Sequence, residues 1–192
     1  MTRKVEPDPP RQRLRIIGGD WRGRRIDFPA RPELRPTPDR VRETLFNWLQ
    51  GMLEGSRCLD LFAGSGALGF EAASRGANSV VMVDTDPKVA DHLRAQAEIL
   101  AATQIEIVTA DAQTYLASSP APFDIVFLDP PFGSNLLAPI CHALDDHAAL
   151  KSGARIYLET PAAAGAPAMP ATWELLRSQK AGQVGYHLAA SV

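Results

Sequence analysis

The feature that most constrains the fold is the regular alternation of short apolar runs with helix-like segments from Arg57 onward. Such alternation is typical of a parallel sheet whose strands are joined by crossover helices. We expect strands at 57–62, 79–83, 105–109, 123–129 and 155–159, with helices after Gly66, from Pro87, near 112–118 and around 136–149.

The pattern changes near the C-terminus. Two more expected strands, 173–179 and 183–189, are separated by Lys180-Ala181-Gly182. This connection is too short for a crossover helix, so we expect an antiparallel hairpin. A loop rich in Ala, Pro and Gly is expected at 161–170. The fold class is therefore α/β, with a mostly parallel sheet that ends in an antiparallel hairpin.

The N-terminal region has a different organisation. Segments 13–17 and 24–28 flank the glycine-rich loop 18–23, which predicts a small β-hairpin. After several prolines, apolar residues recur at helical spacing and predict a helix with Thr37 as N-cap and Pro38 at its first position. We expect three parts: a flexible tail at 1–12, a hairpin with its linker at 13–36, and the main domain at 37–192.

Charge is distributed unevenly along the chain. The formal net charge is -2, yet residues 11–42 hold ten arginines and four acidic residues and carry +6. Arginine suits phosphate groups and base edges because its planar guanidinium donates several hydrogen bonds. A nucleic-acid partner and a merely solvated basic arm both remain consistent with this charge.

Several classes of protein and site find little support in the sequence. The apolar runs are far shorter than the roughly 18 residues of a membrane span, and residues 1–13 lack the apolar core of a secretory signal. We therefore expect a cytoplasmic protein with no membrane association. Cys58 and Cys141 have no CxxC partner, and the four histidines are scattered. We expect reduced, buried thiols and no metal.

A glycine-rich turn follows the first strand of the main domain. Gly64, Gly66 and Gly69 match the pattern G-x-G-x-x-G, which lets the backbone turn sharply and approach a nucleotide-like ligand. Asp84 lies twenty positions after Gly64, where a carboxylate can bind ribose hydroxyls. The pattern alone is compatible with NAD and with S-adenosyl-L-methionine.

Acidic residues near the ends of three consecutive strands favour S-adenosyl-L-methionine. Asp60 would face the phosphates of a dinucleotide but suits the ammonium group of a methionine moiety. Asp111 is placed to accept a hydrogen bond from the adenine amino group, although a helix cap is the simpler interpretation of that residue alone. Asp86 is the alternative ribose ligand; we choose Asp84 because it directly follows the apolar run. The expected cofactor-binding residues are Asp60, Phe62, Gly64, Ser65, Gly66, Asp84, Thr85, Asp111 and Ala112.

The most specific motif is Asp129-Pro130-Pro131-Phe132, at the end of the fourth expected strand. An exocyclic amine on a base is a poor nucleophile because its lone pair is delocalised, so an enzyme must position it. The Asp129 carboxylate and the Pro130 carbonyl are suited to accept its two N–H groups. The prolines stiffen the turn, and Phe132 offers a face on which an extruded base stacks. We expect these four residues to be catalytic.

These motifs resemble class I S-adenosyl-L-methionine-dependent methyltransferases, and within them the bacterial small-subunit ribosomal RNA guanine-N2 methyltransferases of the RsmD type. The resemblance covers nearly the whole chain, and its most specific parts are the N-terminal hairpin and the Arg-Pro-Thr segment. The segments that carry it are 15–19, 21–24, 34–37, 39–48, 59–60, 62–69, 129–132, 156–157 with Glu159, and 181–184.

The resemblance implies a seven-stranded Rossmann-like sheet and an N-terminal extension that engages RNA. The implied reaction is methylation of the exocyclic N2 of a guanine in 16S rRNA, guanine 966, on an assembled or assembling small ribosomal subunit. The partner would be that subunit or its assembly intermediate. The expected RNA-binding residues are Arg22, Arg24, Arg25, Arg35, Arg40 and Arg42.

Three other functions compete with this one. A protein glutamine N5-methyltransferase uses a similar Pro-Pro turn, but its first residue is usually Asn, whereas this chain has Asp129. An NAD-dependent oxidoreductase is disfavoured by Asp60. A non-catalytic RNA-binding protein that kept a methyltransferase fold is disfavoured by the intact cofactor and Asp129 motifs.

Overall fold

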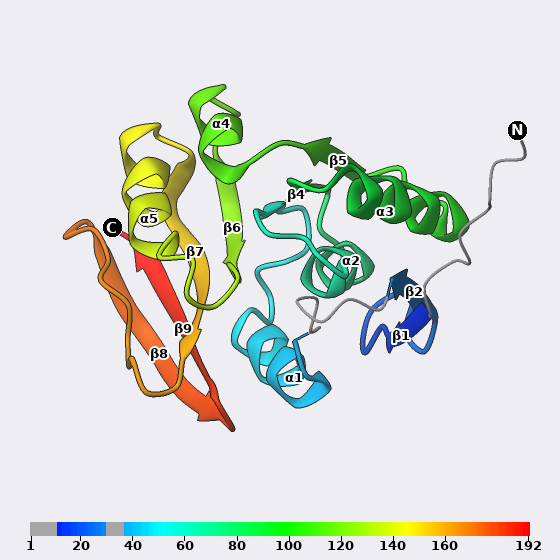
Figure 1. The fold of residues 1–192 in the computed structure, drawn as a ribbon, viewed down its shortest axis with the longest axis horizontal. Helices are drawn as coiled ribbons and strands as arrows, with labels where there is room; N and C mark the ends of the chain where they lie inside the picture. The colour runs from blue at the N-terminus through cyan, green and yellow to red at the C-terminus, as the bar shows by residue number, and fades with distance from the viewer. Residues whose placement is uncertain (1–10, 30–36) are drawn as a thin grey trace, which may run out of the picture.

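The computed structural model describes residues 11–29 and 37–192, and its centre is a seven-stranded sheet (Figure 1). The sheet order is β5-β4-β3-β6-β7-β9-β8. Neighbouring strands from β5 to β7 pair in parallel, whereas β9 pairs antiparallel with both β7 and β8. The strands are β3 (Arg57–Asp60), β4 (Ser79–Asp84), β5 (Ile105–Thr109), β6 (Phe123–Leu128), β7 (Leu150–Pro161), β8 (Trp173–Ala181) and β9 (Val184–Ser191).

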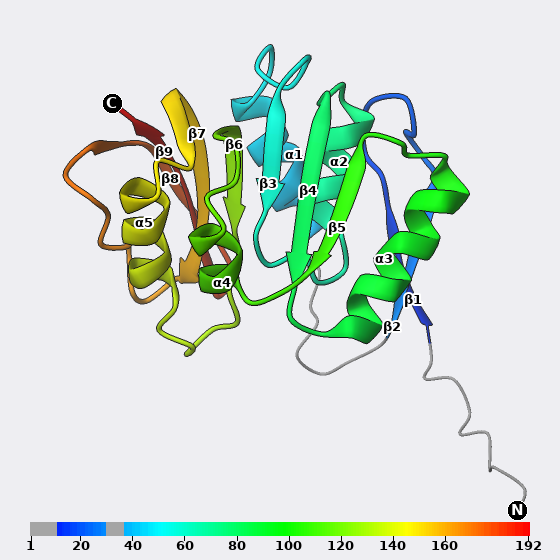
Figure 2. The same ribbon diagram turned by 90° about the horizontal axis from the view of Figure 1, so that it is seen from above.

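Helices cover both faces of the sheet because the central strands are apolar on both sides. Cys58, Val80 and Met82 face one buried cluster, and the alternating residues Leu59 and Val81 face the other. Figure 2 shows α4 and α5 on one side of the sheet and α1 and α2 on the other. The helices are α1 (Asp39–Trp48), α2 (Ala67–Ser74), α3 (Pro87–Leu100), α4 (Ala112–Ala117) and α5 (Leu137–Asp146).

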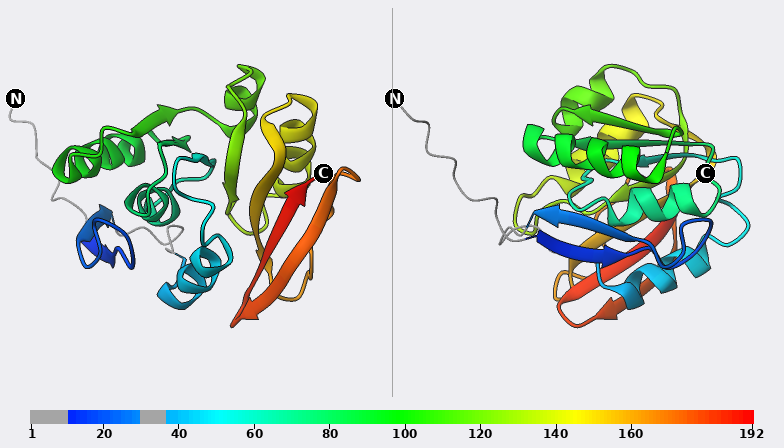
Figure 3. Two further views of the ribbon diagram at one scale, coloured as in Figure 1. Left: turned by 180° about the vertical axis from the view of Figure 1, so that it is seen from behind. Right: turned by 90° about the vertical axis from the view of Figure 1, so that its right-hand side faces the viewer.

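The N-terminal hairpin packs directly on the main domain (Figure 3). It consists of β1 (Arg11–Arg15) and β2 (Arg25–Pro29), paired antiparallel with Leu14 opposite Ile26. Its buried side chains Leu14, Ile16, Ile26 and Phe28 join the same core cluster as α1, α2 and α3. The hairpin is thus held by a shared hydrophobic core. The division of the chain at 12 and 36 stays a prediction, and residues 1–10 and 30–36 lie outside the described residues.

The expected α/β fold, its mostly parallel seven-stranded sheet and its two hairpins are confirmed. Some boundaries were wrong. The strand expected at 155–159 extends over Leu150–Pro161, because residue 150 and residues 155–158 pair with β6, and residues 155–161 pair with β9. The C-terminal hairpin turns at 182–183, since β8 continues through Ala181.

The expected N-cap of the first helix was also wrong. Pro38 is the N-cap of α1, and no side chain caps that end. Thr37 Oγ1 instead donates a hydrogen bond to Glu159 Oε1, at 3.1 Å. A distant buried carboxylate therefore replaces the local cap as the partner of this hydroxyl.

Candidate active site

The glycine-rich turn joins β3 to α2 at the carboxyl edge of the parallel strands. Gly64 and Gly66 have positive φ angles of 49° and 79°. L-residues with side chains rarely adopt this region, so the turn depends on glycine. Asp60 stabilises the turn from within, because its Oδ2 accepts a hydrogen bond of 2.9 Å from the Gly69 N–H.

The reason for glycine at position 66 is internal packing. A Cβ atom there would lie 2.5 Å from Cδ2 of Phe70 and 2.8 Å from Cδ2 of Leu93. Both neighbours belong to the buried core. A side chain at this position would therefore disturb the docking of α2 and α3.

Asp60 is a buried carboxyl group, only 2% exposed. Burial raises its pKa to about 7; the Gly69 N–H acts against this rise, and the negative charge of Asp84 adds to it. A cation bound beside such a group interacts favourably with it, because the cation stabilises the ionised form of the carboxyl group. The site therefore fits a ligand that carries an ammonium group.

Asp84 and Asp86, the two candidate ribose ligands, occupy different roles. Asp84 lies at the end of β4, and its Oδ2 accepts a hydrogen bond of 2.9 Å from the Gly64 N–H. Asp86 is the N-cap of α3 and accepts from the Lys88 N–H. Asp84 thus sits against the glycine turn, while Asp86 caps a helix. Thr85, between them, is exposed.

The remaining predicted cofactor residues surround this edge. Phe62 is half-buried and Ser65 is buried within the turn. Asp111 caps α4, where its two carboxylate oxygens accept hydrogen bonds from the backbone N–H and the hydroxyl of Thr114. The Thr114 hydrogen bonds lower the pKa of Asp111. The cap interpretation of Asp111 is therefore the one that the geometry supports, and the next residue, Ala112, is buried.

The Asp129-Pro130-Pro131-Phe132 turn follows β6, which pairs with β3. Pro130 is buried, whereas the Phe132 ring is 50% exposed and is among the few large exposed apolar side chains of the described residues. Burial raises the pKa of Asp129 well above its usual range, and the charges of Glu159 and Asp60 add to the rise. The turn thus offers a carboxyl group of reduced acidity beside an exposed aromatic face.

Glu159 is the site residue that sequence reasoning missed. It lies in β7 and is 4% exposed, and its Oε1 accepts hydrogen bonds from the Tyr157 hydroxyl at 2.8 Å and from Thr37. Burial raises the pKa of Glu159. A glutamate within an apolar strand was the available signal, since such a residue is seldom buried without a specific partner.

The acidic groups at this edge act on one another. Asp84 raises the pKa of Asp60, and Asp60 raises the pKa of Asp129. This concentration of carboxyl groups suits a cationic ligand and a nitrogen that becomes positively charged. Among residues 11–29 and 37–192, no three His, Cys, Asp or Glu side chains are grouped so that they could hold a metal ion. In the same ranges, no helix is long and apolar enough to span a membrane.

The predicted RNA-binding arginines separate into different classes. Arg22, Arg25 and Arg40 are exposed. Arg24 is exposed but anchored, because it donates a hydrogen bond to the Ile99 carbonyl oxygen. Arg35 lies outside the described residues.

Arg42 does not belong to a basic surface. Its side chain is 1% exposed and forms ion pairs with Asp39 at 2.6 Å and Glu71 at 3.4 Å. It also donates a hydrogen bond to the Arg15 carbonyl oxygen. The expectation that Arg42 contacts RNA was wrong, because its charge is used inside the protein to join α1 to the hairpin and to α2.

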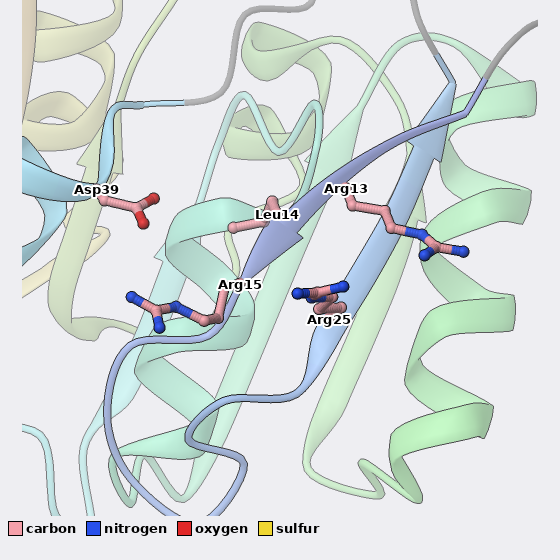
Figure 4. A pocket seen from close by; sticks show the side chains of 5 residues that line it. All are labelled: Arg13, Leu14, Arg15, Arg25 and Asp39. Carbon is pink, nitrogen blue, oxygen red and sulfur yellow. The ribbon is translucent and has the colours of Figure 1, made fainter.

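Two arginines that were not predicted, Arg13 and Arg15, lie on the hairpin beside the predicted Arg25. Arg13, Arg15 and Arg25 line an open hollow of about 350 Å³, with Asp39 on the opposite wall (Figure 4). The register places Arg15 directly opposite Arg25, and Arg13 pairs with Asp27 at 2.9 Å. Because Asp39 is two residues from Thr37, which contacts Glu159, this hollow is linked along the chain to the carboxyl edge.

Comparison with known proteins places these features in context. A family model described as "Conserved hypothetical protein 95" matches residues 14–190. "Ribosomal RNA small subunit methyltransferase D" of Escherichia coli K12 is 46% identical over 175 residues, which cover 91% of this chain and 88% of that protein. The Haemophilus influenzae protein of the same name is 40% identical and covers 97% of this chain and 98% of its own.

Solved structures agree with the sequence relatives. A structure described as a putative methyltransferase, yhhF, from Escherichia coli superposes with a TM-score of 0.88 at 43% identity, over 94% of this chain and 98% of that one. SMU.776, described as a putative methyltransferase complexed with SAH, has a TM-score of 0.71 at 17% identity, over 99% of this chain and 58% of its own. At that identity, the likeness concerns the fold.

Proposed function

This chain belongs to the RsmD family of small-subunit ribosomal RNA methyltransferases, and we propose that it transfers a methyl group from S-adenosyl-L-methionine to the exocyclic N2 of a guanine in 16S rRNA. By its resemblance to that family, the target is guanine 966. We place the protein in the cytoplasm, with the small ribosomal subunit or its assembly intermediate as its partner.

The observation that carries this proposal is the turn at Asp129, with a carboxyl group beside an exposed aromatic ring at the edge that also holds the glycine turn. In the proposed reaction, the Asp129 carboxyl and the Pro130 carbonyl oxygen accept the N–H groups of the amine. Phe132 stacks on the extruded guanine. The two hydrogen bonds and the stacking contact together would hold the nitrogen in line with the methyl group that it receives.

The cofactor is assigned to the turn between β3 and α2. Asp84 would accept hydrogen bonds from the ribose hydroxyls, and Asp60 would face the ammonium group of the methionine moiety. When bound, S-adenosyl-L-methionine supplies an electrophilic methyl group on a positively charged sulfur. The acidic edge would favour that charge over the phosphates of NAD, which supports the choice between the two cofactors.

The exposed arginines of the hairpin are assigned to RNA. Arg22 and Arg25, together with Arg40 at the start of α1, would contact phosphate groups. We add Arg13 and Arg15, because they share the hollow with Arg25. The phosphate contacts would be few and local, because the rest of the chain is acidic. Such a protein favours a substrate in which folded RNA and ribosomal proteins present the target base.

The deciding experiment is methylation of small subunits taken from a strain that lacks its own enzyme, followed by mass spectrometry of the nucleosides. We expect N2-methylguanosine, formed faster on particles than on naked 16S rRNA. Asp129→Asn should lose roughly 100-fold or more in turnover and keep its cofactor affinity. Asp146→Asn, a change at an exposed residue at the end of α5, is the matched control.

Two outcomes would contradict the proposal. Full turnover in Asp129→Asn would remove the carboxyl group from the reaction. Methylated glutamine in a protein substrate, with no methylated nucleoside, would favour the glutamine methyltransferase alternative.

A further inference from the structure

Two carboxyl groups meet at the carboxyl edge of the central strands. Strands β6 and β7 pair in parallel with Leu128 opposite Leu158, so Asp129 and Glu159 follow at equivalent positions. Thr37 Oγ1 donates a hydrogen bond of 3.1 Å to Glu159, and both Glu159 and Thr37 act on the pKa of Asp129. Glu159 is buried and Asp129 is half-buried, and like charges on neighbouring groups in such surroundings repel, so two ionised carboxylates would be costly.

The hydrogen bonds around Glu159 decide which carboxyl group of the pair holds the proton. Its Oε1 already accepts hydrogen bonds from Tyr157 and Thr37, which favour its ionised form. Because two hydroxyl groups donate to Glu159 and stabilise its ionised form, the proton of the pair resides on Asp129.

We propose that Glu159 is a positioning residue for Asp129, and that the pair holds one proton, donated by one Asp129 oxygen to Glu159. The other Asp129 oxygen is then free to accept an N–H of the target amine. This inference rests on the proposed function and adds a second carboxyl group to its machinery. Glu159 would set both the orientation and the protonation state of Asp129.

The pair also provides a route for the proton that the amine must lose. The nitrogen lone pair forms the new N–C bond, the C–S bond breaks with its electrons left on sulfur, and the nitrogen becomes positively charged. Its proton passes to the free oxygen of Asp129 while the Asp129 O–H proton passes to Glu159. The pair changes from a charge of -1 to neutral, and the methylated amine becomes neutral.

Other titratable groups face this pair from neighbouring strands. Asp60 of β3 acts on Asp129, and Tyr157 of β7 acts on Glu159. Tyr186 of β9 acts on Tyr157. Burial raises the pKa of Tyr157 well above its usual range, so this phenol stays a neutral donor. Asp60 is therefore the other acidic group whose titration must be separated from that of the pair.

Infrared spectroscopy of the ligand-free protein tests the shared proton directly. We expect a protonated-carboxyl C=O band near neutral pH that is lost in Asp129→Asn. The same band should be lost in Glu159→Gln, because Asp129 then ionises at lower pH. Asp60→Asn identifies the separate contribution of Asp60, and Glu106→Gln, at an exposed position of β5, is the control that should leave the band unchanged.

The pH profile of turnover on small subunits provides the second measurement. Glu159→Gln should lower kcat roughly 100-fold with little change in KM, and should remove the titration of Glu159 from the acid limb. Thr37→Val should move that limb to higher pH, because Thr37 lowers the pKa of both carboxyl groups. The Thr37→Val measurement also tests the inference if the Glu159 variant fails to fold.

An unchanged infrared carboxyl band in folded Glu159→Gln would overturn the inference. An acid limb that is the same in Glu159→Gln, Thr37→Val and the wild-type protein would overturn it too. The infrared result requires no substrate. If the wild-type protein showed the shared proton but methylated no ribosomal RNA, the proposed function would fail while the carboxyl pair stood.

Discussion

The Glu71 carboxylate in α2 accepts a hydrogen bond of 2.8 Å from the backbone N–H of Gly18, in the loop of the N-terminal hairpin. Its second oxygen accepts from the Ile17 N–H at 2.8 Å, and Arg42 and Arg75 pair with it. Glu71 is fully buried. Because α2 begins at the glycine turn, one helix connects the proposed cofactor site to the proposed RNA-binding hairpin.

Gly19→Ala should disrupt this attachment. The new Cβ would lie 1.7 Å from the Ser74 carbonyl oxygen, at a φ of 74°. Gly23→Ala is the matched control, because its φ is 83° but no atom lies within 4 Å. Both should lose about 1–3 kcal/mol from backbone strain, and Gly19→Ala roughly 1–3 kcal/mol more from the clash. Urea unfolding measures both, and equal losses would mean that the hairpin loop is not tightly docked.

Asp84→Ala should weaken binding of S-adenosyl-L-methionine more than Asp86→Ala does. Asp84 holds the Gly64 N–H as well as the proposed ribose contact, and we expect a loss on the order of 1–3 kcal/mol. Asp86 caps α3, so its removal should cost stability, about 1 kcal/mol, with a smaller effect on affinity. Calorimetry and thermal unfolding of both variants separate the two effects; the reverse ranking would assign the ribose to Asp86.

Cofactor affinity should increase as pH rises toward 7. Asp60 has a pKa raised to about 7, so it is mostly protonated at pH 5.5. An ammonium group favours the carboxylate, so binding should release a proton below pH 7 and strengthen as Asp60 ionises. Calorimetry between pH 5.5 and 7.5 measures this effect. The range lies below the usual pKa of an α-amino group, so the ammonium group of the ligand keeps its charge. Asp60→Asn should show neither the pH dependence nor the proton release, and persistence of both would place the ammonium group elsewhere.

Replacing Arg15 and Arg25 together by Gln should weaken binding to small subunits. For each arginine that binds a phosphate group, its replacement should reduce the slope of log affinity against log salt by about 0.7 to 0.9. Affinity for S-adenosyl-L-methionine should not change, because neither side chain lies at the glycine turn. Arg177→Gln, at an exposed position of β8, is the control. If the double variant and this control bind alike, the hollow is only a solvated surface.

The strand and helix order, the glycine turn and the Asp129 turn were all predictable from the sequence. Each depends on local properties: apolar periodicity, the conformational freedom of glycine and the rigidity of proline. The order of strands in the sheet was not predicted from these patterns, because the chain passes from β5 at one edge to β6 beside β3 and no local signal marks that jump.

The roles of individual charged residues were decided by the tertiary structure. Arg25 and Arg42 belong to the same basic segment, yet Arg25 lines an open hollow and Arg42 is buried against Glu71. Thr37 and Glu159 are 122 residues apart in the chain, and Gly18 and Glu71 are 53 apart. A charged side chain binds a ligand, caps a helix or forms a buried ion pair according to its burial and its partners. Those partners meet only when the chain folds.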